Sequence, residues 1–458
     1  MRTLACPKAR YFWQQGEAVT NHYSTPEWVE PALKKAAIEW FENRLNGARL
    51  HPLSQTCLEI DRIGMTIDRL VQTDAGWQLE KIAFWGTPRT ADKDEFALQH
   101  RLLAQAGVTV AKTVLFLPDK TYIRSGPLDY EKLFKPYDLS RSVANRVKRI
   151  DEALAGLDKP GLPVAPLSVA CLSPIRCPYA EHCYAPVPAH SVLNIARLGG
   201  EKKYELYNRG IVDPKMLDES HPLSPYQRIQ IRSEQEGEAH VVPDALADFL
   251  SSIEFPVYFL DFETVQHPIP PFDDLAPFEP LPFQYSLHVL KAPGGTPEHY
   301  EFLARDREDA REAIAKQLGA KIGQKGSLVA YGADYERRLL RRLAQWVPEL
   351  GEALISMAKR TIDLMIPFDK RWYYHPDMHG SCSLKNVAPV LDKQARYDGL
   401  AIPGGREAME GYLALSDASA RNSERIRANL LAYGRQDSLS MVQIYEKLCD
   451  LTTMELLK

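Results

Sequence analysis

The segment FPVYFLDFET, residues 255–264, constrains the fold of this chain more than any other part of the sequence. It is apolar enough to form a buried strand, yet it contains Asp261 and Glu263. Residues i and i+2 of a strand project to the same face, so both carboxylates point the same way. Two carboxylates buried side by side are costly unless a positive charge lies between them. We therefore expect a buried strand that presents two acids to a cation.

Apolar strand-like runs and helical runs alternate after this segment. The sequence predicts strands at residues 283–290 and 327–331, helices at 306–322 and 334–347, and one long helix or a broken pair at 425–451. This alternation is typical of an α/β domain.

The first 160 residues also have a mixed α/β pattern. The sequence predicts a helix at 26–45, strand-like runs at 57–72 and 76–85, a helix at 94–107 that Gly107 ends, and a strand at 108–118. Residues 160–190 are rich in proline and cysteine, so we expect irregular structure held by something other than secondary structure. We therefore predict an α/β protein with three regions: residues 1–190, a helical connector at 191–250, and residues 251–458.

Length and charge narrow the function. At roughly 150 residues per domain, 458 residues suggest two to three domains. The net charge of −4 gives no overall basic surface, so nucleic-acid binding would need a local basic groove. No apolar stretch of about 18 residues exists, which argues against a membrane span. The first residues lack the apolar run of a signal peptide, so we expect a cytoplasmic protein.

Further acids in the C-terminal half complete a candidate metal site. Glu336 lies in the first turn of a predicted helix, with Asp334 as a competing candidate, and Tyr433 and Asp437 are spaced i and i+4 on one helical face. Hard cations such as Mg²⁺ prefer carboxylate oxygens. Four acids could hold two metals about 3.5–4 Å apart, which would activate water and stabilise the leaving oxygen of a phosphodiester. Tyr433 could then orient the attacking water.

This constellation resembles that of the DEDD exonuclease superfamily, which has an RNase H-like fold. Asp261 and Glu263 match the first motif of that family, D-x-E, and Tyr433 with Asp437 match the tyrosine version of its third, Y-x-x-x-D. The second motif differs, because Glu336 stands where an aspartate is usual. The resemblance implies a mixed sheet flanked by helices and 3′→5′ exonuclease activity on DNA or RNA. It also implies that the four acids hold Mg²⁺ or Mn²⁺.

Four cysteines form a second candidate site. Cys171, Cys177 and Cys183 follow a C-x5-C-x5-C pattern, and Cys6 lies far upstream. Four thiolates suit a 4Fe–4S cluster or a structural zinc. The tight cysteine pairs usual in zinc sites are absent, although His182 keeps a zinc site open.

The cysteine layout resembles that of iron–sulfur nucleases related to RecB, which close their domain with one early and three late cysteines. Within it, residues 66–82 resemble a PD-(D/E)XK core, with Asp68 as the first acid and Glu80 as the second. The lysine expected two residues later is Ile82, and Lys81 projects to the opposite strand face. Gln99 matches a RecB-like glutamine. We therefore predict a weak or inactive nuclease that binds nucleic acid, unless both acids are ordinary hairpin residues.

The whole chain also resembles a group of bacterial proteins that join a cysteine-cluster front half to a C-terminal domain of unknown function. The segments that carry this resemblance are Pro282–His288, His379–Lys385 and Tyr397–Leu400.

Several other residues have both a functional and a structural interpretation. The metals or a substrate phosphate could be contacted by His288, His379, Lys385 and Asp363. The phosphate backbone of a nucleic acid could be contacted by Arg337, Arg338, Arg341 and Arg342. Bases could stack on Tyr373 and Tyr374. Each could equally be a structural or solvated residue. No Walker motif is present, so unwinding would need a helicase partner.

Three hypotheses remain at this stage. The first is a metal-dependent exonuclease with an iron–sulfur-stapled front half. The second is a non-catalytic nucleic-acid-binding scaffold of a repair or defence complex. The third is a zinc-stapled interaction protein.

Overall fold

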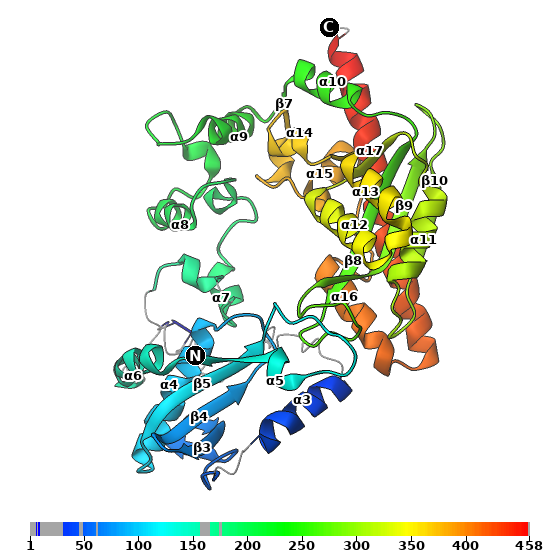
Figure 1. The fold of residues 1–458 in the computed structure, drawn as a ribbon. Coiled ribbons are helices and arrows are strands. Elements are labelled where there is room, and N and C mark those ends of the chain that lie inside the picture. Colours follow the sequence, from blue (N-terminus) through cyan, green and yellow to red (C-terminus); the bar gives the residue numbers. More distant parts are fainter. Residues whose placement is uncertain are drawn as a thin grey trace. The chain divides into compact units, whose positions relative to one another are not determined.

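The chain folds into a mixed α/β protein with mixed β-sheets, seen in the computed structural model of Figure 1. The structure describes residues 6, 8–9, 31–44, 49–60, 63–155, 165–173 and 176–456. It contains two compact units, one formed by residues 1–184 with 266–279 and the other by residues 185–265 with 280–458. Residues 191–250, predicted as a separate connector, therefore lie within the second unit.

The first unit is built on a four-stranded sheet. Its elements are α3 (Pro31–Asn43), β1 (Cys57–Ile60), β2 (Ile63–Thr66), β3 (Arg69–Thr73), β4 (Gly76–Ile82), α4 (Thr90–Gln105), β5 (Val110–Pro118), α5 (Tyr130–Leu133), β6 (Phe134–Asp138), α6 (Ser140–Ala155) and α7 (Ala180–Tyr184). The strand order is β3-β4-β5-β6, antiparallel at both edges and parallel between β4 and β5. A parallel pair needs a crossover, which α4 provides.

The sequence pattern explains most of this unit. Helix α4 buries Phe96 and Leu103 in the same core as Leu79 of β4 and Leu115 of β5. Gly107 follows the helix with φ of +78°, a conformation that favours glycine. The predicted strand at 57–72 is instead three strands, because β1 and β2 pair with each other, with Ile60 opposite Ile63. Of the predicted helix at 26–45, residues 26–30 and residue 45 lie outside the described residues.

The second unit contains the larger sheet. Its elements are α8 (Gly200–Asn208), α9 (Pro225–Glu236), β7 (His240–Val241), α10 (Pro243–Ser251), β8 (Val257–Gln266), β9 (Pro280–Leu290), β10 (Glu298–Leu303), α11 (Arg311–Lys321), β11 (Ser327–Ala330), α12 (Asp334–Trp346), α13 (Gly351–Lys359), β12 (Thr361–Asp363), α14 (Ile366–Asp369), β13 (Tyr373–Tyr374), α15 (Leu384–Leu391), α16 (Gly405–Leu413) and α17 (Ala420–Leu456). The C-terminal segment is thus one 37-residue helix rather than a broken pair.

The five-stranded sheet has helices on both faces (Figure 1). Its order is β10-β9-β8-β11-β12, with β9 and β10 antiparallel and β8, β11 and β12 parallel. Alternate residues of a strand face opposite sides, and β8 follows this rule. Tyr258 accepts a hydrogen bond from the amide of Gly323, just after α11, whereas the ring of Phe259 lies 5.8 Å from that of Tyr445 on α17. Asp261 and Glu263 lie two and four residues after Phe259, so their side chains project to the same face of the sheet and point toward α17.

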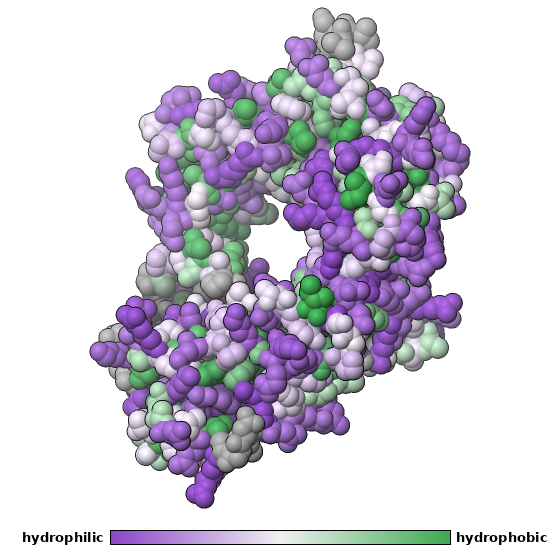
Figure 2. Space-filling model, viewed as in Figure 1, coloured by the Kyte–Doolittle hydropathy of each residue, from purple (hydrophilic) through white to green (hydrophobic). Residues whose placement is uncertain are grey.

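The surface is mainly polar on the face seen in Figure 2, where hydrophobic residues appear as small separate areas. Among the described residues, the exposed large hydrophobic side chains are Leu50, Ile123, Leu172 and Met216. Within the same residues, no helix is both long enough and apolar enough to cross a membrane.

Candidate metal centre

Three of the acids chosen from the sequence converge in the second unit. Asp261 and Glu263 come from β8 and Asp437 comes from α17, and one carboxylate oxygen of each lies within 4.8 Å of the other two. Among the described residues, this is the only group of three or more carboxylate, imidazole or thiol ligands that close together. The strand parity of β8 and the helical position of Asp437 therefore produce a compact acidic centre.

Helix α17 is held at the correct place by buried polar contacts with β9. Gln284 Nε2 donates to the Leu430 carbonyl at 2.7 Å, and the hydroxyls of Ser286 and Ser438 lie 2.7 Å apart. Gly434 allows the close approach, because a Cβ at that position would lie 2.5 Å from Gln284 Nε2. These contacts set the height and rotation of α17, and hence the direction in which Asp437 projects.

Glu336 lies near the centre but outside the three acids whose oxygens come within 4.8 Å of one another, whereas Asp334 faces solvent. Glu336 is buried, and its carboxylate acts electrostatically on both Asp261 and Glu263. Asp334 is exposed and pairs with Arg337 at 2.8 Å. Both acids lie in the first turn of α12, and the position of that turn above β11 determines which one faces inward.

Burial raises the pKa values of these acids, and neighbouring acids raise those of Asp261 and Glu263 further. Burial, then the neighbouring Asp437, Glu263 and Glu336, raise the pKa of Asp261 well above its ordinary range. Burial with the nearby Asp437 and Glu336 raises the pKa of Glu263 to about 8, and burial raises that of Glu336 to about 7. Burial also raises the pKa of Asp437. The centre thus disfavours its own ionisation unless positive charge is supplied.

Two tyrosines and a lysine surround Asp437. Tyr397 donates to Asp437 Oδ1 at 2.6 Å, and Tyr433 lies near enough to Asp437 to lower the pKa of its carboxyl. Lys385 Nζ donates to the Tyr433 hydroxyl at 3.1 Å. No role was predicted for Tyr397, because nothing in its spacing links it to the acids. The one indication in the sequence was that Tyr397 begins the segment Tyr397–Leu400, which resembles the group of bacterial proteins described above.

The acidic centre fits a divalent cation. Asp261 Oδ2 and Glu336 Oε2 are buried, and no hydrogen-bond donor in the described part of the chain reaches either oxygen. A buried, unsatisfied carboxylate oxygen is costly, and a metal ion would satisfy it. The donor set consists of carboxylates alone, which suits Mg²⁺ or Mn²⁺ better than a softer metal.

Several lesser candidates have structural partners. Asp363 Oδ1 accepts from the amides of Gly332 and Met365, so it holds a turn and acts on Glu336 only electrostatically. His288 hydrogen-bonds to Ser438 at 2.8 Å, and burial lowers its pKa to about 3. It therefore supports α17 as a neutral ring.

The aromatic and basic candidates also have structural partners. Tyr373 and Tyr374 are buried in the core, so neither is available to stack on a base. On α12, Arg337 donates to the Thr361 carbonyl at 2.7 Å and Arg342 lies over Trp346 at 4.7 Å. Arg338 and Arg341 are exposed.

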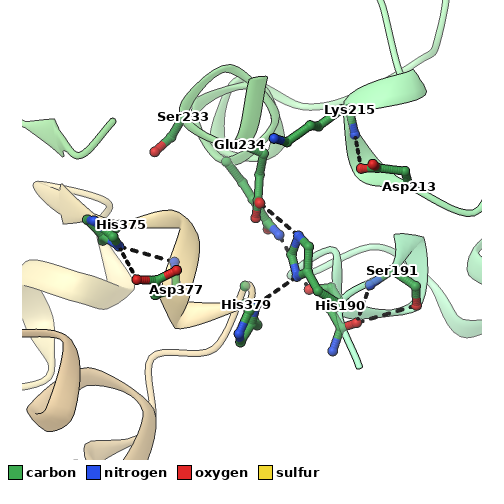
Figure 3. Close-up of polar contacts among 12 residues, drawn as sticks. His190, Ser191, Asp213, Lys215, Ser233, Glu234, His375, Asp377 and His379 are labelled. Atoms are coloured by element: carbon green, nitrogen blue, oxygen red, sulfur yellow. Dashed lines mark hydrogen bonds and ion pairs between the residues drawn. The ribbon is translucent and has the colours of Figure 1, made fainter. Parts of the chain in front are cut away.

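His379 is bound to another histidine rather than to the acids. Its Nδ1 lies 2.9 Å from Nδ1 of His190, whose Nε2 lies 2.7 Å from a buried Glu234 carboxylate oxygen (Figure 3). The other Glu234 oxygen accepts from Tyr374 at 2.7 Å. This chain of contacts fastens α9 and the segment at residue 190 to the loop before α15.

The four predicted cysteine ligands all lie in the first unit. Burial raises the pKa of Cys183, and Cys6, Cys171 and Cys177 lie near enough to raise it further. The Cys177 amide donates to the Cys171 carbonyl at 2.7 Å. In the described residues, no three of these sulfurs lie within 4.8 Å of one another. Zinc holds its sulfurs about 3.8 Å apart, so the arrangement is wider than a formed zinc site.

Asp68 and Glu80 have different partners. Asp68 accepts from Gln99 Nε2 at 2.8 Å and lies 3.7 Å from Lys81 Nζ, whereas Glu80 pairs with Arg69 at 3.1 Å. Burial lowers the pKa of Lys81, but the Asp68 and Glu95 carboxylates outweigh it and keep the pKa above its ordinary value. Lys81 therefore places a charged ammonium beside Asp68.

One segment of the chain, mostly in the second unit, is similar to a known family. Residues 258–383 match a family model described as Domain of unknown function (DUF2779). The matched segment contains Asp261, Glu263 and Glu336, and Tyr433 and Asp437 lie beyond its end. No curated protein and no solved structure matches the chain. The similarity fits a domain of unknown function and assigns no chemistry to these residues.

Proposed function

We propose that this protein is a metal-dependent nuclease, a DEDD-type 3′→5′ exonuclease on DNA or RNA whose second unit is an RNase H-like domain. The observation that carries the proposal is the convergence of Asp261, Glu263 and Asp437 within 4.8 Å, with buried Glu336 beside them. A mixed sheet with helices on both faces agrees with the fold that the resemblance implies.

The residues of the centre have two different proposed roles. Asp261, Glu263, Glu336 and Asp437 would hold the cations, which would supply an activated water and stabilise the leaving oxygen of the phosphodiester. The Tyr433 hydroxyl accepts a hydrogen bond from Lys385 at 3.1 Å and lies near Asp437, so it is placed to orient a water. A fixed donor in a buried site needs no reorganisation during the reaction.

The first unit is proposed to be a RecB-like PD-(D/E)XK module that no longer cleaves. A metal there would need Asp68 and Glu80 together, yet these acids bind different cationic side chains. Cys6, Cys171, Cys177 and Cys183 are proposed to hold a 4Fe–4S cluster, whose ligands are spread over four iron atoms and need a wider spacing than zinc allows. This module would then help to bind nucleic acid.

The test is hydrolysis of end-labelled single-stranded DNA and RNA by anaerobically purified protein with Mn²⁺. We expect shortening from the 3′ end by the native protein and loss of at least about a thousandfold in Asp261→Asn, because the variant removes one carboxylate charge from the group that would hold the cations. Asp334→Asn is the matched control and should keep full activity, because Asp334 is exposed on the same helix as Glu336.

The same experiment distinguishes the nuclease from a non-catalytic nucleic-acid-binding scaffold. Full hydrolysis by a folded Asp261→Asn protein would contradict the assignment of the centre. Binding of nucleic acid without metal-dependent hydrolysis by the native protein would favour a non-catalytic scaffold of a repair or defence complex.

A further inference from the structure

Lys385 lies beside Tyr433 and Tyr397, the two tyrosines next to Asp437, and forms no ion pair with an acid within 4.0 Å among the described residues. Its ammonium acts electrostatically on Asp261, Glu263 and Asp437, and in each case it favours the charged carboxylate. Within the described part of the chain, no other basic side chain has this effect on all three acids. In the absence of metal, Lys385 therefore supplies part of the positive charge that a divalent ion would supply.

The ammonium is held by polar and aromatic groups rather than buried in one ion pair. Nζ donates to the Tyr433 hydroxyl at 3.1 Å and to the Pro403 carbonyl, and it lies 4.6 Å from the ring centre of Tyr433 and 5.3 Å from that of Tyr397. Such contacts guide a lysine without neutralising its charge. Lys385 thus remains able to contact an anion.

The segment from Tyr397 to Gly405 passes beside the same centre. Tyr397 binds Asp437, the Pro403 carbonyl binds Lys385, and a Cβ on Gly405 would lie 3.5 Å from Glu263 Oε2. A Cβ on Gly404 would lie 3.6 Å from Lys385 Nζ. The same Cβ on Gly404 would lie 2.7 Å from Glu407 Oε2, so the Glu407 carboxylate occupies that place near the ammonium, and Gly405 is the glycine that leaves room beside Glu263.

We propose that Lys385 has two successive partners: it is the internal counter-ion of the metal-free acids, and it becomes a ligand of the substrate phosphate once cations occupy the centre. The inference rests on the proposed nuclease function and adds a fifth charged residue to that site. The physical reason is that an ammonium and a divalent cation beside the same carboxylates repel each other. A lysine has a compact charge on a flexible stem, so the ammonium can move toward a phosphate, whose negative charge favours it.

This assignment predicts opposite effects on the two kinds of ligand. In Lys385→Gln, the affinity of the metal-free full-length protein for Mn²⁺ should increase by about tenfold, because a competing positive charge is gone. With metal saturating, kcat/KM on a labelled single strand should fall by about tenfold or more. The slope of log(kcat/KM) against log salt concentration should also become less steep by about 0.7, the value for one lost phosphate contact.

Two variants serve as controls. Lys393→Gln removes an exposed lysine just after α15 and should leave Mn²⁺ affinity and the salt slope unchanged. Lys385→Arg keeps the charge, so its Mn²⁺ affinity should stay near that of the native protein. Mn²⁺ affinity is measured by calorimetry and thus does not depend on hydrolysis.

Each measurement can overturn one part of the assignment. Unchanged or weaker Mn²⁺ binding by folded Lys385→Gln would overturn the counter-ion role. An unchanged salt slope would overturn the phosphate contact. If the native protein binds Mn²⁺ but hydrolyses nothing, the nuclease proposal and the phosphate contact both fail, while the counter-ion role is still decided by the Mn²⁺ affinities.

Discussion

At the scale of single residues, burial decides which acids form the centre. Asp334 and Glu336 are two positions apart, yet one is exposed beside Arg337 and the other is buried beside Asp261 and Glu263. The raised pKa values follow from that burial, and they make the acids sensitive to pH when no metal is bound.

The metal-free protein should lose stability as pH rises. The pKa of Glu263 is raised from 4.5 to about 8, so between these values the native protein holds a proton that the unfolded chain has released. Glu336, with a pKa raised to about 7, acts in the same direction. Below pH 6.5 the buried His288, whose pKa is lowered to about 3, acts in the opposite direction, so urea unfolding in a chelator should show a free energy of unfolding that falls from pH 6.5 to 8.

Two comparisons check the origin of that decline. Glu263→Gln should flatten it, whereas Asp334→Asn should leave it as it is, because Asp334 is exposed. Saturating Mn²⁺ should remove the decline, since the metal stabilises the charged carboxylates. A chelated native protein whose stability rises over this range would contradict the assigned pKa shifts.

The sequence predicted the acids better than it predicted their surroundings. Asp261 and Glu263 could be recognised because their spacing on an apolar strand has one physical interpretation, a shared face. The choice between Asp334 and Glu336 depended on where a helix turn lies above a strand, which no local pattern encodes. Tyr397 approaches Asp437 from a segment 40 residues away, so only the folded chain reveals the contact.

At the scale of elements, strong periodicity could be predicted and irregular pairing could not. Helices α4 and α12 have clear apolar faces and occur where the sequence predicts them. The run at 57–72 was predicted as one strand, because nothing in its composition marks the pairing of β1 with β2. The close packing of α17 against β9 depends on Gly434, and the sequence alone does not show that these two elements pack together.

Gly434→Ala should destabilise the protein despite the helix preference for alanine. Alanine gains about 1 kcal/mol of helix propensity, but its methyl would lie 2.5 Å from Gln284 Nε2 and displace a buried hydrogen bond worth about 1–3 kcal/mol. We expect a net loss of about 1 kcal/mol together with weaker Mn²⁺ binding, because Asp437 lies one turn further along α17. Urea unfolding and Mn²⁺ calorimetry measure the two effects.

Gly411→Ala is the matched control for this change. Gly411 lies inside α16, and a Cβ there would meet neighbours at 3.7 Å or more. This variant should gain up to about 1 kcal/mol and keep its Mn²⁺ affinity. Equal stability of both variants would argue that α17 does not depend on a close approach to β9.

At the scale of the whole molecule, each unit has its own core. Phe96, Leu79 and Leu115 belong to a core within the first unit, and Phe259, Phe368 and Tyr445 to one within the second. The sequence predicted mixed α/β structure in both halves, but the helical segment before β8 shares the compact unit of the acids. Its apolar side chains on α10 pack with α17, a contact that composition alone does not indicate.

Separate cores mean that damage to the cysteine site should leave the metal centre intact. In Cys177→Ser, a buried thiol of the proposed 4Fe–4S site is lost, so the anaerobically purified protein should lose its brown colour and the first unit should unfold at a lower temperature. Mn²⁺ affinity should remain unchanged, because the acids belong to the other core. Cys57→Ser, which changes an exposed cysteine on β1, should keep the colour.

Two outcomes would contradict this prediction. A colourless native protein with bound zinc would identify the cysteine site as a structural zinc site. Loss of Mn²⁺ binding in Cys177→Ser would show that the two units are energetically coupled.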